Sequence, residues 1–181
     1  GKWNDILTTP NPGDQYTYIN LIFNYTRGIA FVRKNNLKEA EEELAFIANR
    51  DKELDQENIA EVAFEVLAGE IEASKGDLIK AIAHLERAVE FEDELPYDEP
   101  AVWYIPTRQT LGAILLKAKN YVEAEKIYKQ DLDYYRQNGW SLMGLHQSLL
   151  GQGKIEEAQK IKLQFEKSWE KSDIKITSSI L

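Results

Sequence analysis

The stretch TLGAILLKAKNYVEAEKIYK, residues 110–129, decides the fold of this 181-residue chain. It places one small residue, Gly112, twelve positions before another, Ala124, with the polar-apolar pair Asn120-Tyr121 between them. A large residue, Tyr128, follows Ala124 by four positions, which is about one helical turn. Small residues let two helices approach closely, and a short turn makes neighbouring helices antiparallel. The stretch therefore predicts an antiparallel helical hairpin.

This hairpin motif occurs four times along the chain. In the other copies the first small position, the turn and the second small position are Gly28, Asn36-Leu37 and Ala40; Gly69, Asp77-Leu78 and Ala81; and His146, Lys154-Ile155 and Ala158. The large residue that follows is Leu44 in the first copy and Leu85 in the second. In the fourth copy Lys162 stands at this position. A single hairpin leaves one apolar face uncovered, and the next hairpin covers it. The repeat predicts an all-α fold, a right-handed superhelical stack of antiparallel helix hairpins.

Boundary signals divide the chain into about eight helices. We expect them near residues 14–34, 37–52, 56–75, 77–92, 105–118, 121–136, 140–152 and 155–171. Asp14 and Asp77 are the expected N-caps, Gly76 is an expected helix stop, and Pro106 fits only a first turn. The repeat domain spans 14–172, with repeats at 14–54, 55–100, 101–138 and 139–172. Residues 1–13 are expected to hold the remnant of a preceding helix and a linker, and 173–181 to form an extended C-terminal tail packed on the last hairpin.

The motif resembles the tetratricopeptide repeat family. The copies that carry this resemblance best are Leu111-Gly112…Leu115…Ala124…Tyr128 and Ala68-Gly69…Ala81…Leu85…Ala88. Resemblance to this family implies an α-solenoid whose concave groove binds ligands. The segments Pro96–Pro100, Trp103-Tyr104 and Asn138–Trp140 resemble an uncharacterised bacterial subgroup, which implies a bacterial source and no assigned activity.

Composition narrows the classes of partner. The chain carries 31 acidic against 22 basic residues, a net charge of −9, which disfavours nucleic acid and anionic membranes as partners. It has no cysteine and no apolar run near the ~20 residues of a membrane span. We expect a soluble protein, either cytoplasmic or exported. The start, with Gly1 in place of Met and helix-like residues at once, is typical of a fragment and leaves the compartment open.

The family resemblance assigns the groove to one face of each first helix. Seven side chains are predicted to line it as one continuous concave surface: Tyr25, Arg33, Glu70, Gln109, Lys117, Trp140 and Gln147. Arg33 and Lys117 would supply positive charge, and Trp140 is the candidate aromatic anchor. The alternative is that this face packs on the chain's own helices or on a second copy. The family's carboxylate clamp is not matched, because Tyr25 and Glu70 stand among the clamp positions.

Two further segments have a functional and a structural interpretation. Trp103, Tyr104 and Arg108 could grip a ligand by stacking and charge. We favour a structural role, in which Trp103 staples the long linker to the repeat stack and Arg108 pairs with a carboxylate of the loop. Residues 90–99 hold six carboxylates without a cation, which could bind calcium loosely. A solvated acidic loop is the favoured interpretation, and we predict no metal site.

The sequence gives little support for catalysis. His84 and His146 are the only histidines, and no nucleophile motif, zinc-protease motif or phosphate loop is present. The leading hypothesis is a non-catalytic protein-interaction scaffold without a cofactor, which binds a peptide or partner protein in its groove. The alternatives are a homo-oligomeric structural module and an accessory domain of a larger enzyme or ligand-binding protein.

Overall fold

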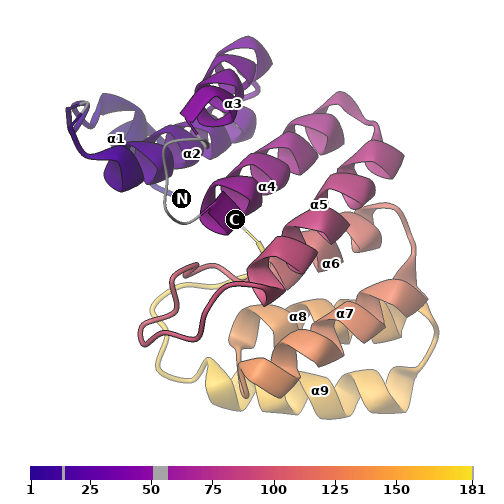
Figure 1. Cartoon of the computed structure of the whole chain (residues 1–181). Coiled ribbons are helices and arrows are strands. Elements are labelled where there is room, and N and C mark those ends of the chain that lie inside the picture. Colours follow the sequence, from indigo (N-terminus) through magenta and orange to yellow (C-terminus); the bar gives the residue numbers. More distant parts are fainter. Residues whose placement is uncertain (14, 51–56, 181) are drawn as a thin grey trace. The chain divides into compact units, whose positions relative to one another are not determined.

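The computed structural model describes residues 1–13, 15–50 and 57–180 (Figure 1). Over these residues the chain forms nine α-helices and no β-strand, which confirms the predicted all-α class. The helices are α1 Trp3–Thr8, α2 Thr17–Arg33, α3 Leu37–Arg50, α4 Glu57–Lys75, α5 Leu78–Asp93, α6 Thr107–Lys117, α7 Tyr121–Tyr134, α8 Gly139–Gly151 and α9 Ile155–Ser168.

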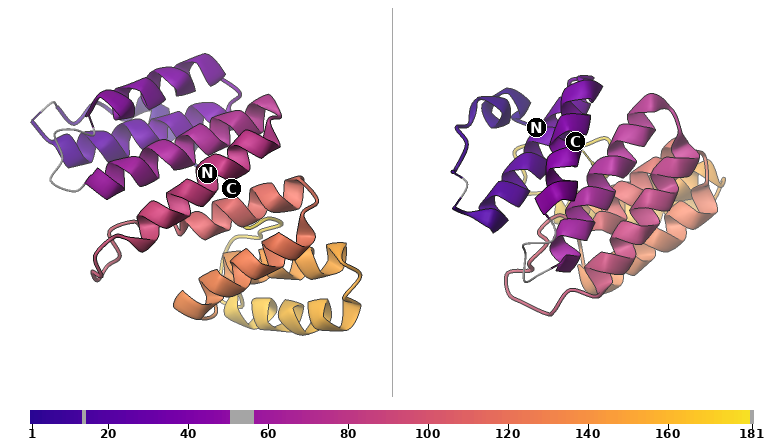
Figure 2. Two further views of the ribbon diagram at one scale, coloured as in Figure 1. Left: turned by 45° about the vertical axis from the view of Figure 1, so that its right-hand side comes forward. Right: turned by 45° about the horizontal axis from the view of Figure 1, so that its top comes forward.

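The chain divides into two units, Gly1–Tyr104 and Ile105–Leu181. In unit 1, α2 pairs with α3 and α4 pairs with α5, while α4 also packs on α2 and α3, and α1 packs on α2. In unit 2, α6 pairs with α7 and α8 pairs with α9, while α8 also packs on α6 and α7. Figure 2 shows the helices of each pair lying side by side. Each unit therefore holds two hairpins that cover one another.

The turns inside the four hairpins share one backbone conformation, which explains the fixed offset of the sequence motif. Each turn begins with a residue of positive φ: Asn35 at 58°, Gly76 at 90°, Lys119 at 59° and Gly153 at 76°. In the third turn the amide of Lys119 donates to the carbonyl of Leu116, and the amide of Asn120 donates to that of Leu115. The same two bonds recur in the other three turns. These bonds satisfy carbonyl groups at the end of the first helix. A single residue then separates the positive-φ residue from the start of the second helix.

Several predicted boundaries are met and one needs correction. The side chain of Asp77 caps α5 by accepting a hydrogen bond from the amide of Lys80 at 3.1 Å, as predicted. The helix predicted from 105 begins instead at Thr107, because Pro106 has an extended backbone with ψ of 124° and precedes α6. The expected N-cap Asp14 and the expected end near Lys52 lie outside the described residues.

Small residues lie at close helix contacts, although their partners vary. A Cβ built on Gly69 would lie 2.8 Å from Cγ of Leu85, the large residue of the same hairpin. A Cβ on Gly28 would instead overlap Cδ2 of Leu67, which belongs to the next hairpin. The motif implied Leu44 as the partner of Gly28, but α2 packs on α4 as well as on α3, and Leu44 is half-buried.

Candidate functional site

The face of unit 2 that α6 and α8 form together, called its inner face below, is built around the side chain of Tyr128. This residue belongs to α7, but its ring passes between α6 and α8 at two glycines. A Cβ on Gly112 would overlap Cζ of the ring, and a Cβ on Gly144 would overlap the same atom. The ring is fully buried, and this burial raises the pKa of the phenol well above its ordinary value. The two glycines therefore form a gap through which α7 delivers a hydroxyl to the opposite side of the α6/α8 pair.

The Tyr128 hydroxyl meets the segment that follows α9. Its oxygen lies 2.6 Å from Oγ of Ser179, and that Oγ lies 3.2 Å from the carbonyl oxygen of Gln109 in α6. A carbonyl only accepts, so the single hydroxyl proton of Ser179 is donated to Gln109 and the phenol donates to Ser179. Ser179 is 1% exposed. The two hydroxyls and the carbonyl thus form a directed, water-excluded chain of hydrogen bonds.

Two more contacts hold this C-terminal tail, residues 173–180, against unit 2. The side-chain amide of Gln147 in α8 donates to the carbonyl oxygen of Thr177 at 2.6 Å, and the side chain of Ile176 is buried. Gln109 and Gln147 were both predicted groove residues; Gln147 meets the tail with its side chain, whereas Gln109 meets it with its backbone carbonyl and its own side chain is buried. The tail therefore contacts α6, α7 and α8 and is not limited to the last hairpin.

Trp140, the predicted anchor, supports the start of the tail. Its half-buried ring meets the ring of Trp169 edge-on, with centroids 5.5 Å apart. Trp169 also stacks on Phe165 at 5.8 Å, and its indole N–H donates to the carbonyl of Ile174 at 2.8 Å. Trp140 therefore acts on the tail through one intervening residue, and its contact with an external ligand stays a prediction.

The remaining candidates of unit 2 lie toward its surface. Lys117, the last residue of α6, is exposed. The guanidinium of Arg108 lies over the ring of Tyr134, 5.4 Å from its centroid, so one cation–π contact joins α6 to α7. Lys117 is consequently the predicted positive point that unit 2 presents at its surface.

In unit 1 the predicted residues Arg33 and Glu70 bind each other. Two guanidinium nitrogens of Arg33 lie 2.7 and 2.6 Å from the two carboxylate oxygens of Glu70, a bidentate pair between α2 and α4. The side chain of Glu70 is 5% exposed. The charge of Arg33 is balanced inside the unit, so Arg33 does not supply the positive point that the sequence predicted.

Tyr25 is covered by the linker that follows α5. Its ring meets Trp103 edge-on with centroids 4.9 Å apart, and both side chains are buried. Burial, together with the charge of Glu70, raises the pKa of the Tyr25 phenol. The hydroxyl of Tyr18 donates to the carbonyl of Val102 beside Trp103 at 3.5 Å. Trp103 thus fixes the linker to unit 1, in agreement with the favoured structural interpretation, while Tyr104 beside it remains more than half exposed.

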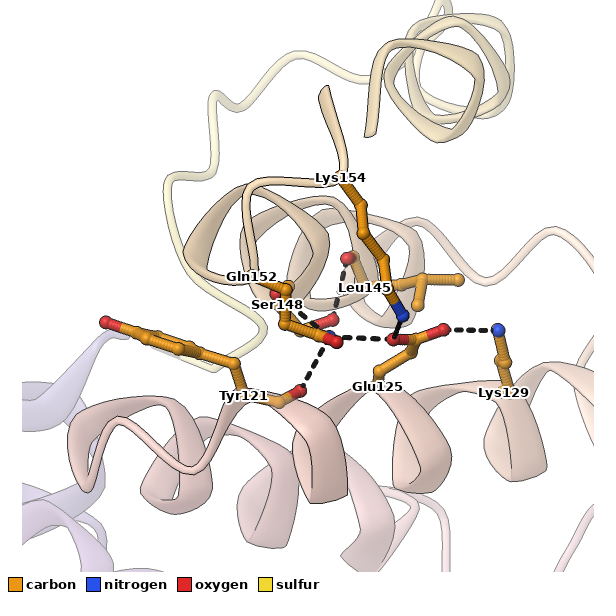
Figure 3. Close-up of polar contacts among 7 residues, drawn as sticks. All are labelled: Tyr121, Glu125, Lys129, Leu145, Ser148, Gln152 and Lys154. Atoms are coloured by element: carbon orange, nitrogen blue, oxygen red, sulfur yellow. Dashed lines mark hydrogen bonds and ion pairs between the residues drawn. The ribbon is translucent and has the colours of Figure 1, made fainter. Parts of the chain in front are cut away.

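A second polar cluster of unit 2 fixes the joint between its hairpins (Figure 3). The carboxylate of Glu125 in α7 accepts from Lys154 at 2.7 Å, from the amide of Gln152 at 2.7 Å, and from Lys129. Burial alone would raise the pKa of Glu125, but the three donors lower it to about 2. The side-chain amide of Gln152 also donates to the carbonyl of Tyr121. These bonds tie the turn after α8 to α7, so the cluster has a structural role.

Asp131 orients the start of α8. Its carboxylate accepts from the hydroxyl of Ser141 and, at 3.1 Å, from the side-chain amide of Asn138. The side-chain oxygen of Asn138 accepts from the amide of Trp140 and caps the helix. Burial raises the pKa of Asp131 above its ordinary value, although these two donors oppose the shift. This network sets the direction in which Trp140 leaves the turn.

Both histidines have structural partners. Nδ1 of His84 lies 2.5 Å from Oε2 of Glu65, whose carboxylate also accepts from Arg87. His146 occupies the glycine position of the fourth motif, and its Nδ1 lies 2.9 Å from the carbonyl of Ala158. Because a carbonyl only accepts, Nδ1 of His146 carries the proton. A bond between ring and backbone thus replaces the glycine contact of the other hairpins.

The described residues contain no cluster of three or more acidic or histidine side chains arranged to hold a metal ion. In the acidic loop, Tyr97 donates to Glu99, and the side chain of Asp98 accepts from the amide of Glu99. Over the part of the chain that the structure describes, no helix has the length and apolar character needed to cross a bilayer.

No protein-family model matches this chain, and a search of curated proteins finds no significant match.

Sequence reasoning missed three residues of the inner face of unit 2: the Tyr128 hydroxyl, Gly144 and Ser179. The motif placed Tyr128 as a large packing residue, and it contains no signal for what the hydroxyl meets. Gly144 could have been noticed, because a glycine inside a helix is unfavourable unless something packs against it. Ser179 carries no local signal, since its partners are 51 and 70 residues away in the sequence.

Proposed function

We propose that this protein is a non-catalytic interaction module of the tetratricopeptide type, which binds an extended segment of a partner protein. In this proposal the hairpins stack as a right-handed α-solenoid, and the inner faces of the first helices form the binding surface. The partner segment lies along that surface, with its main chain bonded to polar side chains and its apolar side chains in gaps between helices.

One observation carries the proposal: the inner face of unit 2 already holds a non-helical segment, the C-terminal tail, which bends at residues 173–174 and 177–179 and is not the extended segment that the sequence predicted. The bond from Gln147 to the carbonyl of Thr177 is directed to the main chain, and every peptide offers such a carbonyl. The side chain of Ser179 is buried on the same face, against Tyr128 and Gln109, and the side chain of Ile176 is buried as well. A surface that combines main-chain bonds with side-chain positions has the chemistry of a peptide site.

The test is binding of a tiled peptide library from the source organism to the purified chain. We expect a subset of peptides to bind, and Lys117→Glu to weaken that binding roughly tenfold, as for a charged hot spot. The control is Lys160→Glu, which makes the same charge change on the exposed side of α9. Peptides that bind the Lys117→Glu variant as tightly as the unchanged chain would refute the proposed surface.

A further inference from the structure

We infer that residues 176–180 are a built-in ligand of the α6/α8 face, and that the partner segment this face selects carries the same pattern. That pattern is an apolar residue followed three positions later by an unmodified serine. The inference rests on the proposed function and specifies its partner and its regulation. It follows from three features of the tail contacts, taken in turn.

The first feature is the main-chain bond, which sets the register. Gln147 holds the carbonyl of Thr177, while the side chain of Thr177 is exposed. This position is therefore bound without regard to side-chain identity. The neighbouring Ile176 is 8% exposed, whereas Ile174 is 47% exposed. Selectivity for an apolar side chain is thus expected at position 176 and not at position 174.

The second feature is the site for the serine hydroxyl. Two protein groups define it, the Tyr128 hydroxyl, which donates, and the Gln109 carbonyl, which accepts. A ligand group that fits must accept one hydrogen bond and donate another within a very small volume, which a serine hydroxyl does. Alanine would leave both buried protein groups unpaired. A phosphate would not fit a position that is 1% exposed and faces a carbonyl oxygen.

The third feature is covalent attachment. The tail follows α9 directly, and Trp169 fixes its start through the bond to Ile174. A ligand tethered in this way has an effective concentration in the millimolar range. An external segment must therefore compete with the tail, so the tail sets a threshold of affinity that partners must exceed. Phosphorylation of the released Ser179 would keep the tail out of its site and lower that threshold.

The experiment compares the full chain with a variant that lacks residues 173–181. The probe is a fluorescent peptide of the deleted sequence, DIKITSSIL. The shortened chain should bind this peptide saturably, and the full chain at least about tenfold more weakly because of its own tail. In the peptide, Ser179→Ala should weaken binding about tenfold or more, since two buried groups lose their partner. Phosphoserine at 179 should abolish binding.

Matched peptide variants test the pattern. Ile176→Ala should weaken binding more than Ile174→Ala, and Thr177→Ala should leave binding within about twofold because its side chain is exposed. Equal effects of Ser179→Ala and Thr177→Ala would overturn the assignment of the hydroxyl site.

A second variant covers the case in which the shortened chain does not fold. The full-length chain with Ser179→Asp keeps its tail, but the charged aspartate side chain cannot enter the buried site. It should bind the unchanged peptide as the shortened chain does. Folded variants that both fail to bind the peptide would overturn the inference, and so would failure of both to fold, because the tail would then be a structural part of unit 2.

The outcomes separate this inference from the proposed function. If library peptides bind but removal of the tail leaves their affinity unchanged, the inference fails and the interaction module stands. If no library peptide binds either form while the tail peptide binds the shortened chain, the tail is a ligand of the α6/α8 face, but the proposed function as a module that binds partner proteins fails. A full chain that is dimeric while the shortened chain is monomeric would mean that the tail acts on a second copy, which overturns binding within one chain.

Discussion

The second and third hairpins use the same motif with different large residues, and the difference changes what each hairpin can do. In α4/α5, Leu85 packs against Gly69 and ends in the core. In α6/α7, Tyr128 packs against Gly112, continues past Gly144 and presents a hydroxyl to the tail. An aliphatic residue at this position packs between the two helices of its own hairpin. A tyrosine there links the hairpin to a third segment, provided that a second glycine opens the way.

The two units also differ in how their first helices are joined. In unit 1 the bidentate pair of Arg33 and Glu70 connects α2 to α4. In unit 2 the tail bridges α6 and α8 through Gln109 and Gln147. In the direct ion pair the two side chains satisfy each other, whereas the bridge in unit 2 is a separate segment that, in our proposal, a partner can replace. This contrast is the reason that we place the proposed binding face in unit 2. The four predictions that follow test the contacts that distinguish the hairpins and the two units.

The largest effect is expected from Glu70→Ala in unit 1. The change leaves the guanidinium of Arg33 in a largely buried position without its carboxylate, which costs about 3–5 kcal/mol of unfolding free energy. Chemical denaturation measures this cost. The control is Glu39→Ala on the exposed side of α3, where the expected change is within about 0.5 kcal/mol. Equal effects of the two changes would show that the ion pair does not hold α2 to α4.

The second prediction compares Glu125 with Glu41, which holds the same position in the first motif, one residue after the small alanine. Both bind a lysine at or beyond the end of the next helix: Lys75 is the last residue of α4 and lies 2.8 Å from Glu41, and Lys154, the N-cap of α9, lies 2.7 Å from Glu125. Glu41 is 50% exposed, but Glu125 is only 10% exposed. We expect Glu125→Gln to cost about 1.5–3 kcal/mol and Glu41→Gln at most about 1 kcal/mol.

The pKa of Glu125 gives this prediction a pH signature. The folded-state pKa of about 2 lies below the ordinary value of 4.5, so the carboxylate stabilises the fold fully above pH 4.5. That contribution is lost as the pH falls from 4.5 toward 2. Unfolding free energy measured across this range should fall less steeply in Glu125→Gln than in the unchanged chain. Parallel curves would contradict the assigned cluster.

The third prediction tests the gap at Tyr128. Gly144→Ala places a methyl group against the aromatic ring and should cost about 1–3 kcal/mol. In a Tyr128→Leu background, which imitates the α4/α5 hairpin, the same change should cost at least about 1 kcal/mol less. The four unfolding free energies of this cycle give the coupling directly. Additive effects would show that the packing at Gly144 is not coupled to the ring of Tyr128.

The smallest effect concerns the hairpin turns. Lys119 adopts a positive φ of 59°, a conformation that costs a residue with a Cβ about 1 kcal/mol. Lys119→Gly should therefore stabilise unit 2 by about 0.5–1 kcal/mol. Gly76→Lys at the equivalent turn of unit 1 should destabilise by a similar amount. Thermal melts of both variants check the prediction, which fails if the two shifts have the same sign.

The sequence by itself determined the local part of this protein. The four motifs predicted four hairpins with turns at the observed positions, because a turn needs only a residue that tolerates positive φ and a few backbone bonds between near neighbours. The N-cap at Asp77 followed for the same reason, since its acceptor and donor are three residues apart. The small residues at close helix contacts were also readable from their spacing.

Only the tertiary structure decided what the predicted site residues contact. Arg33 meets Glu70 across 37 positions, and Ser179 meets Gln109 across 70. Periodicity identifies the face of a helix on which a residue lies, but it does not identify which distant side chain completes a hydrogen bond there. The energy of such a bond depends on burial and on both partners together. Which side chains stay exposed on the α6/α8 face is therefore set by the path of the tail, and no local pattern encodes that path.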